Sequence, residues 1–138
     1  MGSDEPTSTG IAAITASGMT FALVSGNLYY FEFNVLYDCG NSTAGLSLGL
    51  TFPSAVVIAA SARIPSGTGT EVIGNISSAT SRVTATGNPA VGSQIYAKVE
   101  GVIQASANGN LALFYACEIS TTGGPKIRAG TNGLLYTL

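Results

Sequence analysis

The fold is decided by the stretch Tyr29-Tyr30-Phe31-Glu32-Phe33-Asn34-Val35-Leu36-Tyr37, in which large apolar residues recur at every second position. One face of this stretch is entirely apolar, whereas the other face also carries Glu32 and Asn34. Successive side chains of a β-strand point to opposite sides of the sheet. The pattern therefore predicts a long strand with one face in a core, and we expect it to end at Asp38-Cys39-Gly40-Asn41.

The same period of two continues along most of the chain. Clear strands are expected at Leu46–Phe52, Val56–Ile64, Gln94–Ala105 and Leu111–Ser120, and weaker ones at Glu71–Ile76, Ser81–Thr86, Lys126–Arg128 and Leu134–Leu138. Val56–Ile64 is apolar on both faces, so it needs cover on both sides. Asn108-Gly109 is a strong signal for a tight hairpin. With no helical pattern, the sequence predicts one all-β domain, an antiparallel β-sandwich of jelly-roll-like type.

Length and composition restrict the classes of partner. The chain has 138 residues, which suits a single domain because domains cluster at roughly 100–150 residues. Charged residues make up 9% of it, the net charge is −2 and the five basic residues are scattered. A nucleic-acid partner is not expected, because binding a phosphate backbone needs a cluster of Lys and Arg. A membrane span is not expected either, because the longest apolar run, residues 55–60, is far shorter than the ~20 residues required.

Residues 1–18 are expected to form an N-terminal arm, and residues 19–138 the β domain. The first ten residues are polar, with Pro6 and Gly10, so the arm either frays or becomes ordered on a partner. Deleting residues 1–10 is accordingly predicted to leave the β domain folded. The start of the chain lacks the basic and apolar regions of a signal peptide, so Cys39 and Cys117 are expected to be reduced, buried thiols.

Catalytic chemistry is not expected. The chain contains no histidine, which removes the commonest general base and metal ligand. Gly45-Leu46-Ser47-Leu48-Gly49 matches the nucleophile elbow of hydrolases, but it lies inside an alternating strand instead of a strand-to-helix turn. The spacing of the carboxylates selects no catalytic pair, and the expected role of Glu32, Glu100 and Glu118 is to face solvent or a neighbouring subunit, paired with Lys98, Arg82 or Arg128. No cofactor or metal site is predicted.

Two regions of the sequence resemble a known domain. The first region, near the start of the chain, is Thr20-Phe21-Ala22-Leu23-Val24-Ser25-Gly26-Asn27-Leu28-Tyr29-Tyr30-Phe31-Glu32-Phe33. The second region, near the end, consists of Gly101-Val102-Ile103-Gln104, Asn108-Gly109-Asn110-Leu111-Ala112-Leu113, Ala116-Cys117-Glu118 and Ile127-Arg128-Ala129-Gly130-Thr131. Together they resemble a small β domain of tailed-bacteriophage and prophage virion structural proteins. The resemblance covers roughly residues 19–138, with Thr131 where serine is usual in that domain.

The resemblance implies a structural virion protein, assembled in the host bacterial cytoplasm. Because the domain here stands almost alone, the first hypothesis is a capsid decoration (cement) protein that forms a homotrimer, binds the major capsid protein and stabilises the head lattice. The alternative is a tail-tip or tail-fibre domain that recognises host-surface glycans through Tyr and Asn side chains on its loops. Tyr30, Leu36 and Phe114 are large apolar residues on the faces opposite the core, so they are predicted to lie in the oligomer interface.

Overall fold

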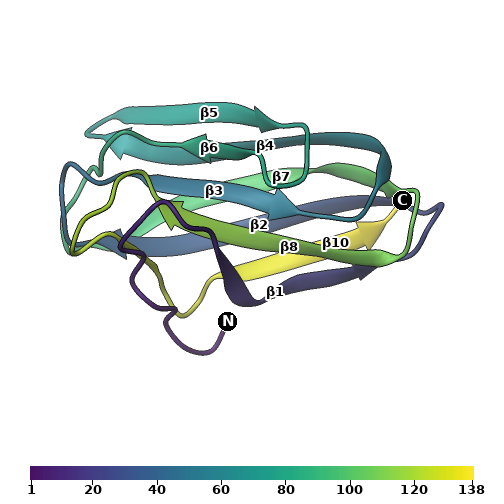
Figure 1. Cartoon of the computed structure of the whole chain (residues 1–138), viewed down its shortest axis with the longest axis horizontal. Helices are drawn as coiled ribbons and strands as arrows, with labels where there is room; N and C mark the ends of the chain where they lie inside the picture. The colour runs from purple at the N-terminus through teal and green to yellow at the C-terminus, as the bar shows by residue number, and fades with distance from the viewer.

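The computed structural model describes all residues 1–138, and every regular element is a β-strand. The strands form two antiparallel sheets that face each other, as Figure 1 shows. The four-stranded sheet contains β1 (Ile14–Leu23), β8 (Gly109–Cys117), β3 (Leu46–Thr51) and β6 (Arg82–Thr84), in that order. The second sheet has the order β10 (Asn132–Thr137), β2 (Leu28–Cys39), β7 (Ile95–Ala105), β4 (Ala55–Gly67) and β5 (Thr70–Ile76), and the short β9 (Pro125–Ile127) also pairs with β2.

The order of the first eight strands is that of a jelly roll. β1-β8-β3-β6 faces β2-β7-β4-β5, and β9 and β10 extend the second sheet at the β2 edge. The prediction of an antiparallel, jelly-roll-like β-sandwich is therefore confirmed. The predicted strands are all present, and the long one from Tyr29 to Tyr37 is the centre of β2.

The core lies between the sheets and is built by the alternation seen in the sequence. In β2, Phe31, Phe33 and Val35 are fully buried, whereas the residues between them are only partly buried. The opposite sheet contributes Leu46, Leu48 and Leu50 from β3, together with Leu111, Leu113 and Tyr115 from β8. Burial of one such large side chain stabilises the fold by about 1.5–3 kcal/mol.

The predicted hairpin at Asn108-Gly109 is wrong, because the strands on either side of it belong to different sheets. β7 pairs with β2 and β4, while β8 pairs with β1 and β3. Gly109 is required for another reason: a Cβ there would lie 2.8 Å from Cβ of Pro53. The Asn108 side chain accepts a hydrogen bond from the Ser25 backbone and so joins this turn to the β1–β2 turn.

The N-terminal region also differs from the expected arm over residues 1–18. β1 begins at Ile14, so the last five residues of the expected arm belong to the sheet. Residues 1–13 lie along the body (Figure 1), where Glu5 N–H donates to the Ile127 carbonyl and Ser8 N–H to the Pro125 carbonyl. Ser8 is 1% exposed and its hydroxyl accepts from Cys117 N–H. The segment becomes ordered because it covers the free edge of β9 and the end of β8.

Candidate functional site

The outer face of the four-stranded sheet is covered by its own chain. Phe114 points outward from β8, yet it is only 2% exposed. Its ring lies over Gly49, where an added Cβ would approach the ring to 2.2 Å, and the Arg82 guanidinium lies 5.8 Å from the ring centroid. Arg82 in turn donates a hydrogen bond of 2.9 Å to the Ile11 carbonyl of the N-terminal segment. This face therefore has no large apolar group at Phe114 to offer a partner.

The outer face of the second sheet is open, and we call it the open face. Its side chains form rows across the strands, because the register places them directly opposite one another. One row runs from Tyr136 on β10 through Tyr30 and Val102 to Ala59 on β4. A neighbouring row contains Leu28, Gln104 and Val57. Together with Leu138, these apolar residues form the apolar end of the open face, at the end of the sandwich where the C-terminus lies (Figure 1).

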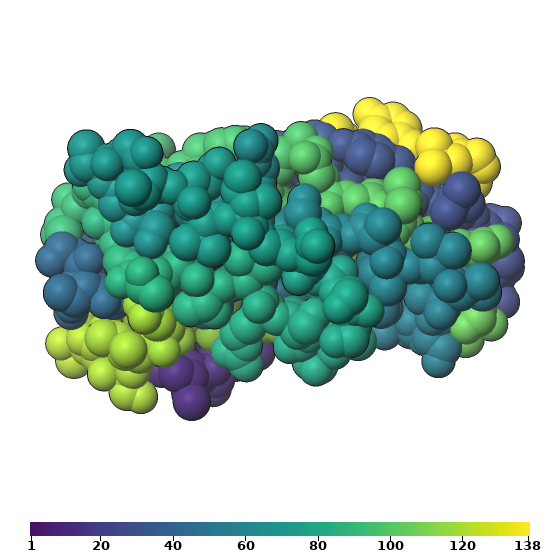
Figure 2. Space-filling view, turned by 90° about the horizontal axis from the view of Figure 1, so that it is seen from above, coloured from purple at the N-terminus to yellow at the C-terminus, as the bar shows by residue number.

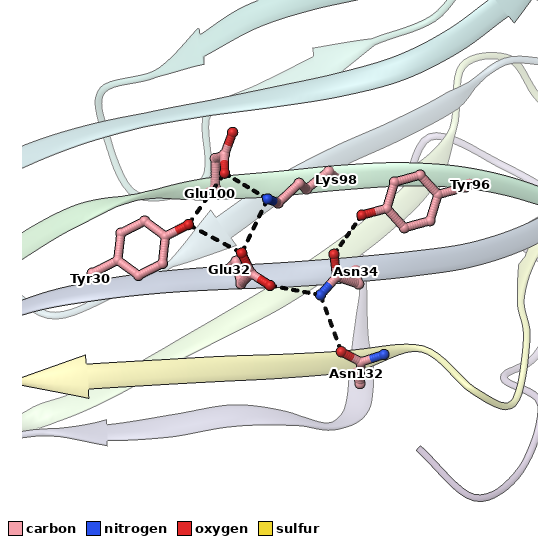
Figure 3. Close-up of polar contacts among 7 residues, drawn as sticks. All are labelled: Tyr30, Glu32, Asn34, Tyr96, Lys98, Glu100 and Asn132. Atoms are coloured by element: carbon pink, nitrogen blue, oxygen red, sulfur yellow. Dashed lines mark hydrogen bonds and ion pairs between the residues drawn. The ribbon is translucent and has the colours of Figure 1, made fainter.

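The middle of the open face is polar, and we call it the charged cluster. Its rows are Leu134, Glu32, Glu100, Ser61 and Asn75, followed by Asn132, Asn34, Lys98, Arg63 and Ile73. Figure 3 shows seven side chains from β2, β7 and β10 joined by hydrogen bonds and ion pairs, namely Tyr30, Glu32, Asn34, Tyr96, Lys98, Glu100 and Asn132. The open face thus has two parts of different chemistry on one sheet.

Lys98 is the centre of the charged cluster. Its ammonium group lies 2.8 Å from Oε2 of Glu100 and 3.1 Å from Oε2 of Glu32, so one cation joins two carboxylates (Figure 3). The Tyr30 hydroxyl shares its one proton between the same two carboxylates, at 3.1 Å from Glu32 and 3.3 Å from Glu100. The Asn34 amide then links Glu32 to Asn132 on β10. These bonds fix the side chains on three neighbouring strands.

The same contacts keep the two carboxylates ionised. Hydrogen bonds from Asn34 and Lys98 lower the pKa of Glu32, and the hydrogen bond from Lys98 lowers the pKa of Glu100. Conversely, the bonds to Glu100 and Glu32 raise the pKa of the Lys98 ammonium group. Burial raises the pKa of the Tyr30 hydroxyl, which stays protonated as a donor.

The three predicted interface residues occupy different environments. Tyr30 lies on the open face, where its ring stacks on Tyr136 with 6.3 Å between centroids. Leu36 is on the same face but partly covered by the loop before β10, because its backbone bonds to Thr131 and Arg128. Phe114 lies on the opposite sheet and is buried within the chain. The structure therefore brings Tyr30 and Leu36 to one face and removes Phe114, which the covering N-terminal segment and Arg82 hide.

The serine of the motif considered in the sequence is buried on the covered outer face of the four-stranded sheet. Ser47 is 1% exposed in β3, and its hydroxyl is 2.9 Å from that of Thr84 on β6. No group of three or more His, Cys, Asp or Glu side chains is arranged to hold a metal ion. No helix of the structure has the length and apolar character needed to cross a membrane.

Cys39 and Cys117 are free and buried, as predicted, and burial raises the pKa of the Cys39 thiol.

The expected charge pairs are found in part. Glu32 and Glu100 pair with Lys98, as the sequence suggested. Arg128 instead bridges Asp4 of the N-terminal segment and Asp38 at the end of β2. Glu118 accepts a backbone N–H from Gly45. The sequence could indicate the polarity of these positions, whereas the partners depend on strand register.

In comparisons with known proteins, no family model, curated protein or solved structure matches this chain. The jelly-roll fold and the chemistry of the open face are therefore the observations on which a function can be argued.

Proposed function

We propose that this chain is a structural virion protein of a tailed bacteriophage, a decoration (cement) protein that assembles as a homotrimer and binds the major capsid protein on the outside of the head. The observation that carries the proposal is the apolar end of the open face. The row Tyr136, Tyr30, Val102 and Ala59 is not covered by any segment of the chain. Exposed apolar patches of this kind mark interaction sites.

The fold and the composition also support this role. Jelly rolls are common among viral capsid domains. A chain with 9% charged residues has few charged side chains to keep it soluble as a monomer, and burial of its apolar surface between neighbours removes that disadvantage. Such attachment depends on apolar contact and backbone hydrogen bonds, because five basic and seven acidic residues make only a weak field. Assembly in the bacterial cytoplasm and a final location in the virion follow from this role.

The test is to mix purified protein with undecorated heads at about 50 mM and about 500 mM salt, a range over which screening of exposed charges changes strongly. Occupancy is measured by sedimentation. We expect nearly equal occupancy at both salt concentrations and hundreds of copies on each particle. Loss of occupancy at high salt, or labelled protein found only at the tail tip, would contradict the decoration role.

A second candidate is recognition of host-surface glycans by a tail-tip or tail-fibre domain. The observation in its favour is that Tyr30, Tyr96 and Tyr136 lie on the same face as Asn34 and Asn132, although on strands instead of the loops we expected. Aromatic rings and amides of this kind suit the apolar faces and hydroxyl groups of sugars. A shift of the tyrosine NMR signals on adding host cell-wall oligosaccharides, together with a few copies per particle, would favour this role.

A further inference from the structure

The edge of the second sheet has a gap beside the end of β5. β5 pairs with β4 only from Ala60 to Gly67, whereas β7 pairs with β4 from Ala55 onward. Residues 56–59 of β4 therefore have a neighbouring strand on the β7 side alone. Val56 is 68% exposed and lies at a register shift between Ala55 and Val57, whereas residues 57–59 pair regularly with β7 and carry no Lys, Glu or Pro of the kind that protects ordinary sheet edges. The backbone of this stretch is free to pair with one more strand.

The gap is built by the chain's own turn. After Ile76 the chain leaves the second sheet and crosses to the first, where Thr80 N–H donates to the Leu50 carbonyl. Thr80 has a φ of 71°, the only residue other than glycine with a positive φ, and that conformation costs free energy for a β-branched residue. Figure 2 views the molecule from the side on which β5 lies in Figure 1, and the teal atoms of this part of the chain occupy much of that surface.

A groove of about 480 Å³ lies at this gap. Its lining comes from β4, the end of β5 and β7, and the residues that matter here are Ala59, Ser61, Asn75, Ser77, Glu100 and Gly101. Ala59 and Ser61 are small, so the side chain of Glu100 on β7 reaches the groove across them. Gly101 allows β4 to approach β7, since a Cβ there would lie 2.4 Å from the Ala59 carbonyl oxygen. The groove is therefore a small-residue channel next to an unpaired strand edge.

The charge in the groove indicates which occupant fits. Glu100 is the one charged lining residue. Its contacts with Lys98 and Tyr30 both use Oε2, so Oε1 is available to a further partner (Figure 3). In a second copy of this chain, each of the five Lys and Arg side chains already has a partner of its own. Lys98 is held by Glu32 and Glu100, Arg63 by Glu71, and Lys126 and Arg128 by Asp4. Arg82 is held by the Ile11 carbonyl and the Phe114 ring.

We propose that this gap receives one extended segment of a different polypeptide, which adds a strand to β4 at residues 56–59 and places a Lys or Arg side chain against Glu100. Backbone hydrogen bonds to β4 give such a complex its affinity, and alternate side chains give it specificity. Val57 and Ala59 are the open-face side chains next to the added strand, so small or β-branched residues suit the positions beside the cation. This inference stands on the isolated chain and does not depend on the virion role.

The test uses the acetylated and amidated peptide Thr-Val-Thr-Lys-Thr-Val-Thr, titrated into the full chain to about 1 mM and followed by backbone NMR. We expect shifts confined to residues 55–61, 75–77 and 100–101, and slower amide hydrogen exchange at residues 56–59. The same peptide with Glu in place of Lys, or with alternate N-methylated residues along one edge, is expected to bind at least about 5-fold more weakly.

Protein variants separate the backbone and charge contributions. Glu100→Gln is expected to weaken binding of the Lys peptide by about 5- to 10-fold, whereas the matched control Glu71→Gln, whose carboxylate pairs with Arg63, leaves it unchanged. Ala59→Phe fills the groove from an exposed position and is expected to abolish binding. The proposal is overturned if no shift occurs at about 1 mM peptide, or if both peptides bind equally. It is also overturned if the variant Tyr136→Lys, which puts a charge into the apolar row proposed for the trimer, still shows concentration-dependent protection of residues 56–59, because a second copy then fills the gap itself.

Discussion

The two outer faces of this sandwich differ in how far other segments of the chain cover them. Over the four-stranded sheet, the N-terminal segment, Arg82 and Phe114 close the surface, and Ser47 is buried beneath. Over the second sheet no segment covers the row from Tyr136 to Ala59, and the charged cluster around Lys98 lies beside it, partly exposed. Exposed apolar side chains are therefore not spread evenly over both outer faces of the sandwich. They lie mainly on the open face, which is why we assign interaction to that surface.

The largest difference in the free energy of unfolding is expected between alanine variants of two aromatic residues, one on each outer face. Phe114→Ala should lower the free energy of unfolding by about 3–5 kcal/mol, because it empties a site that Gly49 and Arg82 enclose. In the monomer, at protein concentrations too low for the trimer to form, Tyr136→Ala on the open face should cost less than about 1 kcal/mol, since that residue is 54% exposed. Urea unfolding of the two variants measures both values. Equal losses would show that the two faces are not covered differently.

Removal of residues 1–10 is expected to have the next largest effect. The sequence predicted that the β domain stays folded without them, and the contacts of the segment add the expectation that the domain becomes less stable. The deletion takes away the partners of Cys117 N–H and of the Tyr115 hydroxyl, which donates to the Pro6 carbonyl at 2.7 Å. We expect a loss of about 2–3 kcal/mol in the free energy of unfolding. Thr7→Ala, an exposed position in the same segment, serves as the control and should change nothing. An unaltered urea midpoint for the deletion would mean that the segment does not stabilise the sandwich.

The charged cluster should give a smaller effect that depends on pH. The pKa values of Glu32 and Glu100 are lowered in the folded state, so their contribution is present above the pKa of the unfolded chain and is lost as the pH falls below about 4.5. Lys98→Met removes the cation between them and should flatten stability between about pH 5 and pH 3. Because these side chains are partly exposed, the change at neutral pH should stay within about 1 kcal/mol. An identical acid profile for Lys98→Met would contradict this account.

The strands could be predicted from the sequence because a half-buried strand leaves a period of two. Phe31, Phe33 and Val35 show it plainly, and the jelly-roll class follows from many such strands. β1 was not predicted in full, because the register shifts between Thr15 and Thr20 and the bulge breaks the alternation. Asn108-Gly109 correctly predicted the position of a turn. It did not predict that the strands on either side belong to different sheets, because local turn chemistry does not determine which sheet the next strand joins.

The candidate site could be predicted only at the level of which face a residue occupies. Alternation placed Tyr30, Leu36 and Phe114 opposite the core, and all three do point outward from their strands. It could not show that Phe114 is covered by Arg82, which lies 32 positions earlier in the chain. Nor could it align Glu32, Lys98 and Glu100 into one cluster, because that depends on the register between β2 and β7. The alternation of apolar residues is a local pattern, so it does not show which distant strands pair or in what register.

The most direct test of the central claim, that the apolar end of the open face is where the protein associates, is the mass in solution. Light scattering at micromolar concentration should give three times 13.9 kDa for the natural chain. Tyr136→Lys, which puts a charge into the apolar row, should give a monomer, while Tyr96→Lys in the charged cluster should remain a trimer. A natural chain that is monomeric, or a Tyr136→Lys variant that stays trimeric, would contradict the account.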